Sequence, residues 1–276
     1  MSEEQRNFGF YGPTGSRSHK ALHAVPPDPM TEPCLRFFRS DSKLTEFLGY
    51  HAHLELITQG LWKHGDAVHI DAEKLNKETG DHIFGGFNFV AKVPPAALAD
   101  FMQTLCRMGF CAAVDNFLTY ISDLLTLIYK TKPEALRSSH TMKTEEILRY
   151  KSMSDLVAAL AERRVYGLAY KGMADLNEEL YRTLGFQLFT KPSDLRRGVI
   201  IIEVRNLAVH NRSVVNAVFL TRVKHKELKV GDEIPMEVEM LLAADNFLGA
   251  TVTDIDNRAA AKFGLPRPIH RKDCGL

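Results

Sequence analysis

Three residues in the second half of the chain, Arg205, Asn206 and His210, have types and a spacing that suit chemistry on a phosphate group. Cleaving RNA without a metal requires a base for the 2′-hydroxyl, an acid for the leaving 5′-oxygen and a cation beside the phosphorane oxygens. Histidine exchanges protons near neutral pH, and a guanidinium stays charged while it matches two phosphate oxygens. Asn206 lies one turn before His210 and is placed to orient the imidazole or the phosphate.

These residues are expected to lie at the end of a helix. A Ser or Asp cap follows Pro192, and a long run with apolar periodicity continues to His210. The β-branched residues 199–202 would also fit a buried strand, but the polar spacing keeps a helical period, so we predict a helix that starts near Asp194. Asn211 is a candidate left-handed cap, and a mostly polar face carries the series Arg196, Val199, Glu203, Asn206 and His210.

The same residues resemble the motif of a known family. The segment 205–211, Arg-Asn-Leu-Ala-Val-His-Asn, is similar to the R-N-x-x-x-H form of the R-x-x-x-x-H motif of HEPN domains. Residues 116–134 are similar to the long first core helix of these domains, and the likeness covers residues 95–225. One branch of the family has a tyrosine two residues after the histidine. Here Arg212 stands at that position, so that feature is absent.

The resemblance implies a fold and an activity. It implies an all-α, HEPN-like helical bundle that acts as a ribonuclease, with Arg205 and His210 as catalytic residues at a dimer cleft. Members of the family cut RNA without a metal, and many act in antiviral defence or toxin systems, so we expect no cofactor. The alternative is a non-catalytic RNA-binding, protein-binding or dimerisation module, in which Arg205 and His210 satisfy each other or a carboxylate.

Further residues are expected to support this site. Glu203, one turn before Asn206, is placed to hold Arg205 or Arg196. Asp123 lies among Leu and Ile in the predicted long helix, where it either pairs with the basic face of the motif helix or remains an exposed carboxylate.

Positive charge is concentrated around the motif. Residues 196–226 contain seven Lys or Arg and one Glu, a net charge of +6. Such a patch can hold phosphate, so Arg196, Arg197 and Arg212 are expected to bind RNA, although a solvated basic helix face is equally compatible.

The spacing of the motif bears on oligomeric state. Arg205 and His210 are five residues apart, so an unbroken helix separates them by about 140° around its axis. Either the helix ends or distorts between Ala208 and His210, or a second copy of the chain completes the site across a two-fold axis. We predict a homodimer. The sequence contains no GTPase, nucleotidyltransferase or kinase motif, so any regulator is expected to be another protein or the N-terminal region.

Composition narrows the class of protein. The chain has 276 residues, 45% of them hydrophobic, and a formal charge of +1, which allows a sizeable core and gives no global basic field. The four cysteines show neither C-x-x-C nor zinc-site spacing, which predicts reduced thiols, no metal site and a cytoplasmic location. Since no eighteen apolar residues run together and residues 1–33 lack an apolar core, we expect neither a membrane span nor a signal peptide.

The remaining elements are expected to form a bundle around one spine helix. Residues 1–33 are predicted to be flexible, and 34–93 to form an N-terminal extension whose helix starts at Asp41 or Ser42 and ends near Lys63. The HEPN-like domain is expected at 94–264, followed by a loose basic tail at 265–276. Within that domain we predict a long helix at 96–130, helices at 144–150, 153–167 and 173–184, a small β-hairpin at 228–235 and a final helix at 237–263.

Overall fold

The computed structural model of the protein describes residues 24–63, 68–70, 89–91, 95–136, 142–169, 171–225 and 227–273. In these ranges the chain forms eight α-helices and one antiparallel pair of three-residue strands, β1 (Val68–Ile70) and β2 (Phe89–Ala91). The expectation of an all-α fold is therefore confirmed for this part of the chain.

Four of the predicted helices have nearly the expected bounds, because Pro or Gly punctuates the sequence beside them. They are α3 (Pro95–Thr131), α6 (Met173–Leu184), α7 (Pro192–His210) and α9 (Val238–Phe263). The other helices are α1 (Glu32–Lys63), α4 (Thr144–Ile147), α5 (Met153–Ala169) and α8 (Ala217–Val223), and short 3-10 turns occur at Pro133–Leu136 and Arg271–Asp273.

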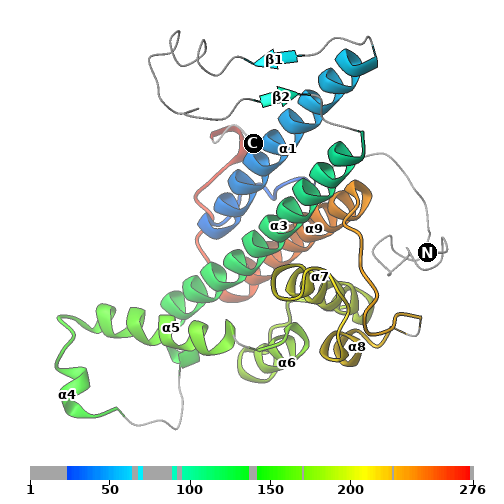
Figure 1. The fold of residues 1–276 in the computed structure, drawn as a ribbon. Helices are drawn as coiled ribbons and strands as arrows, with labels where there is room; N and C mark the ends of the chain where they lie inside the picture. The colour runs from blue at the N-terminus through cyan, green and yellow to red at the C-terminus, as the bar shows by residue number, and fades with distance from the viewer. Residues whose placement is uncertain are drawn as a thin grey trace.

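Helix α3 is the spine of the bundle. It runs beside α1 and α9, α5 crosses one of its ends, and α6, α7 and α8 lie together on one side (Figure 1). Its buried residues follow a three-four spacing: Phe110, Val114, Phe117, Ile121, Leu124 and Ile128. By length and composition alone α3 is apolar enough to cross a membrane, a test that the core helix of a soluble protein also passes. Here its apolar face is packed against other helices.

Helix α1 begins about nine residues earlier than expected, and it shares the core of the bundle. Thr31 Oγ1 accepts a hydrogen bond from Cys34 N at 3.3 Å and donates one to the buried carboxyl of Asp256 in α9. This cap fixes the start of the helix. Phe37 and Phe38 lie in the same hydrophobic cluster as α3 and α9, so the expected boundary at residue 94 does not separate two cores.

The described parts of the N-terminal segment and of the tail, which were expected to be flexible and loose, make defined contacts with each other. Met30 N donates to Ile269 O at 2.9 Å, and His270 Nδ1 lies 2.8 Å from Asp28 Oδ1. Leu265 is buried. These contacts tie residues 28–31 to the segment after α9, because both pack on the same end of the bundle. Residues 1–23 and 274–276 lie outside the described residues.

The turn after α8 is present, but it does not form the expected hairpin. Lys229 O accepts from Asp232 N at 3.1 Å, and Gly231 has the positive φ of +96° that glycine tolerates. The flanking residues pair instead with the segment after α7, because Ile234 N donates to Ser213 O at 3.0 Å and Val215 N to Asp232 O at 2.8 Å. The alternating pattern is therefore satisfied by a partner from elsewhere in the sequence.

Candidate functional site

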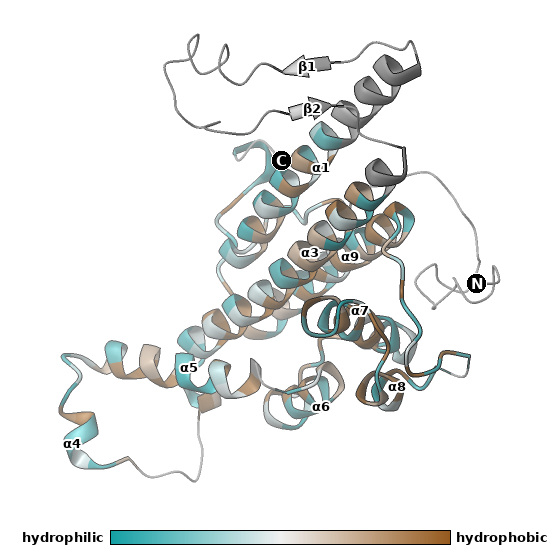
Figure 2. Cartoon of the chain, in the orientation of Figure 1, coloured by the Kyte–Doolittle hydropathy of each residue, from teal (hydrophilic) through white to brown (hydrophobic). Residues whose placement is uncertain are grey.

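Helix α7 continues unbroken through His210 and packs its apolar face into the core of the bundle. Its apolar residues Ile201, Val204 and Leu207 are buried, and the hydrophobic colour is strong along α7 and its neighbour α8 (Figure 2). Gly198 allows close packing on Phe189, since a Cβ there would lie 2.7 Å from the ring. The chain turns after α7 through Arg212 and Ser213, which have positive φ, whereas Asn211 has φ −138°. Asn211 is therefore not the left-handed cap that was expected.

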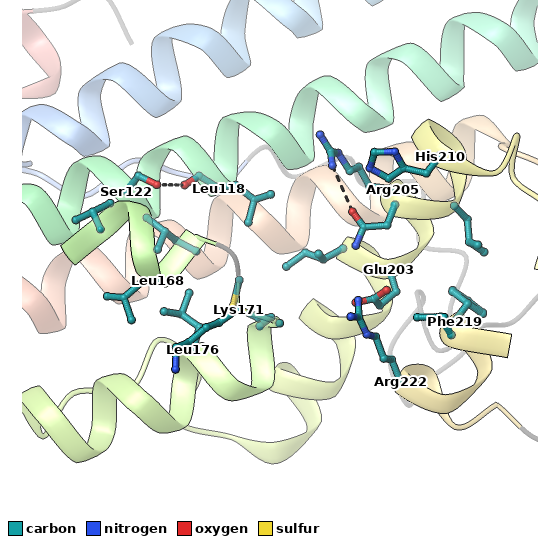
Figure 3. A pocket seen from close by; sticks show the side chains of 18 of the residues that line it. Leu118, Ser122, Leu168, Lys171, Leu176, Glu203, Arg205, His210, Phe219 and Arg222 are labelled. Atoms are coloured by element: carbon teal, nitrogen blue, oxygen red, sulfur yellow. Dashed lines mark hydrogen bonds and ion pairs between the residues drawn. The ribbon is translucent and has the colours of Figure 1, made fainter. Parts of the chain in front are cut away.

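A cavity of about 720 Å³ opens beside α7, between α3, the α5–α6 junction and α8. Its lining from α3, α5 and α6 is mostly aliphatic and includes Leu118, Ile121, Leu125, Leu168 and Leu176. Most of its polar lining comes from α7, α8 and the residues just before α6 and α8 (Figure 3). These polar residues are Lys171, Glu203, Arg205, Asn206, His210, Asn216 and Arg222. Glu203, Asn206 and His210 of the polar face predicted for α7 thus line a cavity within one chain, whereas Arg196 and Val199 do not.

Arg205 is fixed by two partners. Its Nη2 lies 2.7 Å from Asp115 Oδ1 on α3, and its Nη1 donates to Asn206 Oδ1 at 3.3 Å. The sequence interpretation missed Asp115. The available signal was an acid in the apolar spine helix, but Asp123 gives the same signal, and nothing in the sequence ranks one above the other.

His210, the last residue of α7, is exposed and lines the cavity together with Arg205 and Asn206. Figure 3 draws Arg205 and His210 at the same end of the cavity. The two positions are about 140° apart around an ideal helix axis, but the long Arg side chain lets both line one space. Helix geometry therefore does not require a second chain for both residues to line one cavity, and the shared site and the homodimer stay predictions.

Glu203 does not hold Arg205 or Arg196. Its carboxylate, 8% exposed, lies 2.9 Å from Arg222 Nη1 on α8. Helix α8 is set in place by Asn216, whose side chain accepts from Phe219 N at 2.9 Å. Glu203 therefore joins α7 to α8 at the cavity wall.

Asp123 also has a partner other than the one expected. It lies 3.7 Å from Arg36 Nη1 of α1, and its side chain is partly exposed. Because α1 packs on α3, the acid is engaged there and not with α7.

The basic residues of 196–226 do not form one patch. Arg197 is held by Ala243 O at 3.1 Å and lies over the Phe247 ring at 4.6 Å, and burial lowers its pKa. Arg196 is exposed in the first turns of α7, about 20 Å along the helix from His210 at 1.5 Å per residue. Arg212 is exposed beside the end of α7 and remains a candidate for RNA binding. Arg197 is no longer a candidate, because its guanidinium is engaged in packing.

The described residues contain no group of three or more His, Cys, Asp or Glu that could hold a metal ion. Cys34, Cys106 and Cys111 form no disulfide within the described part of the chain, and Cys274 lies outside the described ranges.

Comparisons of the chain with protein-family models, curated proteins and solved structures found no significant match. The likeness to HEPN domains therefore remains a prediction from the motif and the helices around it.

Proposed function

We propose that the protein is a metal-independent endoribonuclease of HEPN type, acting in antiviral defence or a toxin system in the cytoplasm. The observation that supports this function best is the convergence of Arg205, Asn206 and His210 on one cavity. A phosphodiester placed there would meet the guanidinium of Arg205 and the imidazole of His210, a cation and a group that can act as acid or base.

In the proposed reaction the 2′-oxygen of a ribose forms a bond to phosphorus while the bond to the 5′-oxygen breaks. His210 takes the proton of the 2′-hydroxyl or gives one to the leaving 5′-oxygen, and Arg205 stabilises the charge on the non-bridging oxygens. The products are a 2′,3′-cyclic phosphate and a 5′-hydroxyl. Asn206 holds Arg205 through its Oδ1 and keeps its amide N–H groups for the phosphate.

Asp115 is a positioning residue in this proposal. It keeps the guanidinium of Arg205 at the cavity wall, as second partners orient catalytic groups elsewhere. An incoming phosphate competes for the same guanidinium, which has five N–H donors and can serve both partners.

A second copy of the chain would supply the remaining proton carrier. Among the described residues that line the cavity, His210 carries the single imidazole, whereas the reaction uses both a base and an acid. Val209 and Val218, exposed beside His210 and at the cavity, would be covered by such a copy. We therefore retain the predicted homodimer as part of the proposal.

A binding module is the second candidate function. The observation that favours it is that each charged cation lining the cavity already faces a carboxylate: Arg205 faces Asp115, Arg222 faces Glu203 and Lys171 faces Glu179. These pairs, with the aliphatic lining, also suit a site that binds a protein or RNA without cutting it.

The deciding experiment incubates RNA with purified protein in the presence of a chelator and examines the product ends. Cleavage to 2′,3′-cyclic phosphate or 3′-phosphate ends is expected, and a His210→Ala preparation purified in the same way controls for contaminating nucleases. Activity that disappears in chelator and returns with magnesium or manganese would contradict the mechanism. RNA binding without cleavage would favour the binding module.

A further inference from the structure

Three cations surround one nearly buried carboxylate where α5 meets α6. Arg164 Nη2 donates to Glu179 Oε1 at 2.8 Å, Lys171 Nζ lies 3.6 Å from Oε2, and Arg182 Nη2 also binds Oε2. The Glu179 side chain is 10% exposed. Three positive charges face a single negative one, so this cluster keeps a surplus of two positive charges.

Glu179 is surrounded by more positive charge than is required to pair with one carboxylate. Burial raises the pKa of Glu179, but the hydrogen bonds from Arg182 and Arg164 outweigh it and the pKa is lowered, so the carboxylate is charged. One guanidinium would suffice to pair it, and further cations at the same place repel one another. All three cations remain substantially exposed, Arg182 most of all at 74%, so their other N–H groups can reach an anion in solvent.

The cluster borders the candidate site. Lys171 lines the same cavity as His210, and Figure 3 places the two at opposite sides of it, with Leu168 and Leu176 near Lys171. A polyanion with one phosphate at Arg205 and His210 can therefore extend along the cavity toward Lys171. Its less polar parts would then lie on the aliphatic wall.

We propose that Arg164, Lys171 and Arg182 form a second phosphate-binding site, which holds another phosphate of the same RNA strand. The choice of RNA as the polyanion rests on the proposed function. The cation cluster around Glu179 borders the cavity whether or not the bound strand is cut, so the second phosphate site does not require cleavage.

The test measures binding of a 2′-O-methyl RNA oligonucleotide, which resists cleavage, by fluorescence anisotropy over a series of NaCl concentrations. In Arg182→Gln we expect affinity at low salt to fall about two- to fivefold, as for an exposed ion pair. The slope of log affinity against log salt should become shallower by about 0.7, the value for one lost phosphate contact on a single strand. Glu179→Gln keeps the shape, removes the negative charge and should bind more tightly.

Arg36→Gln is the matched control, because Arg36 is similarly exposed and also pairs with acids, but on α1. It should leave affinity and slope unchanged. A wild-type salt slope in Arg182→Gln, with an unchanged melting temperature, would overturn the second phosphate site.

The two proposals fail separately. RNA binding that depends on Arg182 without any cleavage would refute the nuclease and support the second phosphate site. Cleavage by the wild-type protein, together with an unaltered salt slope in Arg182→Gln, would support the nuclease and refute the second phosphate site.

Discussion

The two ends of α7 use the same side-chain types for different purposes. Near the start of the helix, Arg197 lies against the Phe247 ring and donates to Ala243 O, so its charge holds α7 on α9. Near the end, Arg205 contacts Asp115 and lines a cavity with His210. The difference comes from the elements opposite each arginine: an aromatic ring and a carbonyl on α9, but an acid and open space beside α3.

The comparison teaches that a basic stretch is not automatically a binding surface. Two of the three arginines expected to bind RNA lie toward the far end of α7, and Arg197 is engaged in packing. The catalytic proposal therefore depends on the C-terminal turns of α7, and variants at its two ends should separate activity from stability.

The largest effect is expected for His210→Ala. Loss of a general acid or base typically costs about 10²- to 10⁴-fold in rate, so cleavage should fall by that order. His210 is exposed at a helix end, so the melting temperature and RNA affinity should change little. Cleavage at the wild-type rate would remove His210 from the mechanism.

The next variants set Arg205→Ala against Arg197→Ala, two changes of the same kind on one helix. Arg205→Ala should lower the cleavage rate about 10²-fold or more, as loss of one charge-stabilising group does. Arg197→Ala should keep activity but lower the free energy of unfolding by about 1–2 kcal/mol, because it removes a carbonyl hydrogen bond and a cation–π contact. Chemical denaturation and single-turnover cleavage would measure both. Loss of activity in Arg197→Ala with normal activity in Arg205→Ala would contradict the different roles given to the two ends of α7.

A smaller effect is expected when Asp115 is compared with Asp123, the two acids of α3. Asp115→Asn keeps the shape but weakens the hold on Arg205, so the cleavage rate should fall about tenfold, the lower range for partners that orient a functional group. Asp123→Asn loses only a 3.7 Å contact with Arg36 and should cleave normally. Equal rates for both variants would show that Asp115 does not position Arg205. Rescue in Asp115→Glu would support its role.

Much of the scaffold is predictable from the sequence because its signals are local. Pro192 begins the motif helix, Gly185 and Gly264 end α6 and α9 in left-handed geometry, and the apolar spacing of α3 specifies a buried face. Glu203, Asn206 and His210, which line the cavity from α7, were also predicted to share one face of the helix, and Arg205 was identified from the motif.

The partners of those residues were not predictable, because they come from distant elements. Which acid meets Arg205 depends on how α3 lies against α7, and Glu203 meets Arg222 only after α8 folds back. The early start of α1 depends on Asp256, more than two hundred residues away. Helical periodicity gives the face on which a residue lies, but not the group that it meets across the interface.

The cap at the start of α1 makes folding a proton-coupled event. Burial raises the pKa of Asp256, against the hydrogen bonds from Thr31 and the charge of Arg267. Between the ordinary pKa of an aspartate and this raised value, the unfolded chain has lost a proton that the folded chain retains. The folded state then binds more protons, so its stability falls as pH rises through that interval. Replacing Asp256 with Asn should remove this part of the pH dependence in denaturation curves recorded at a series of pH values, and an unchanged profile would show that Asp256 does not titrate there.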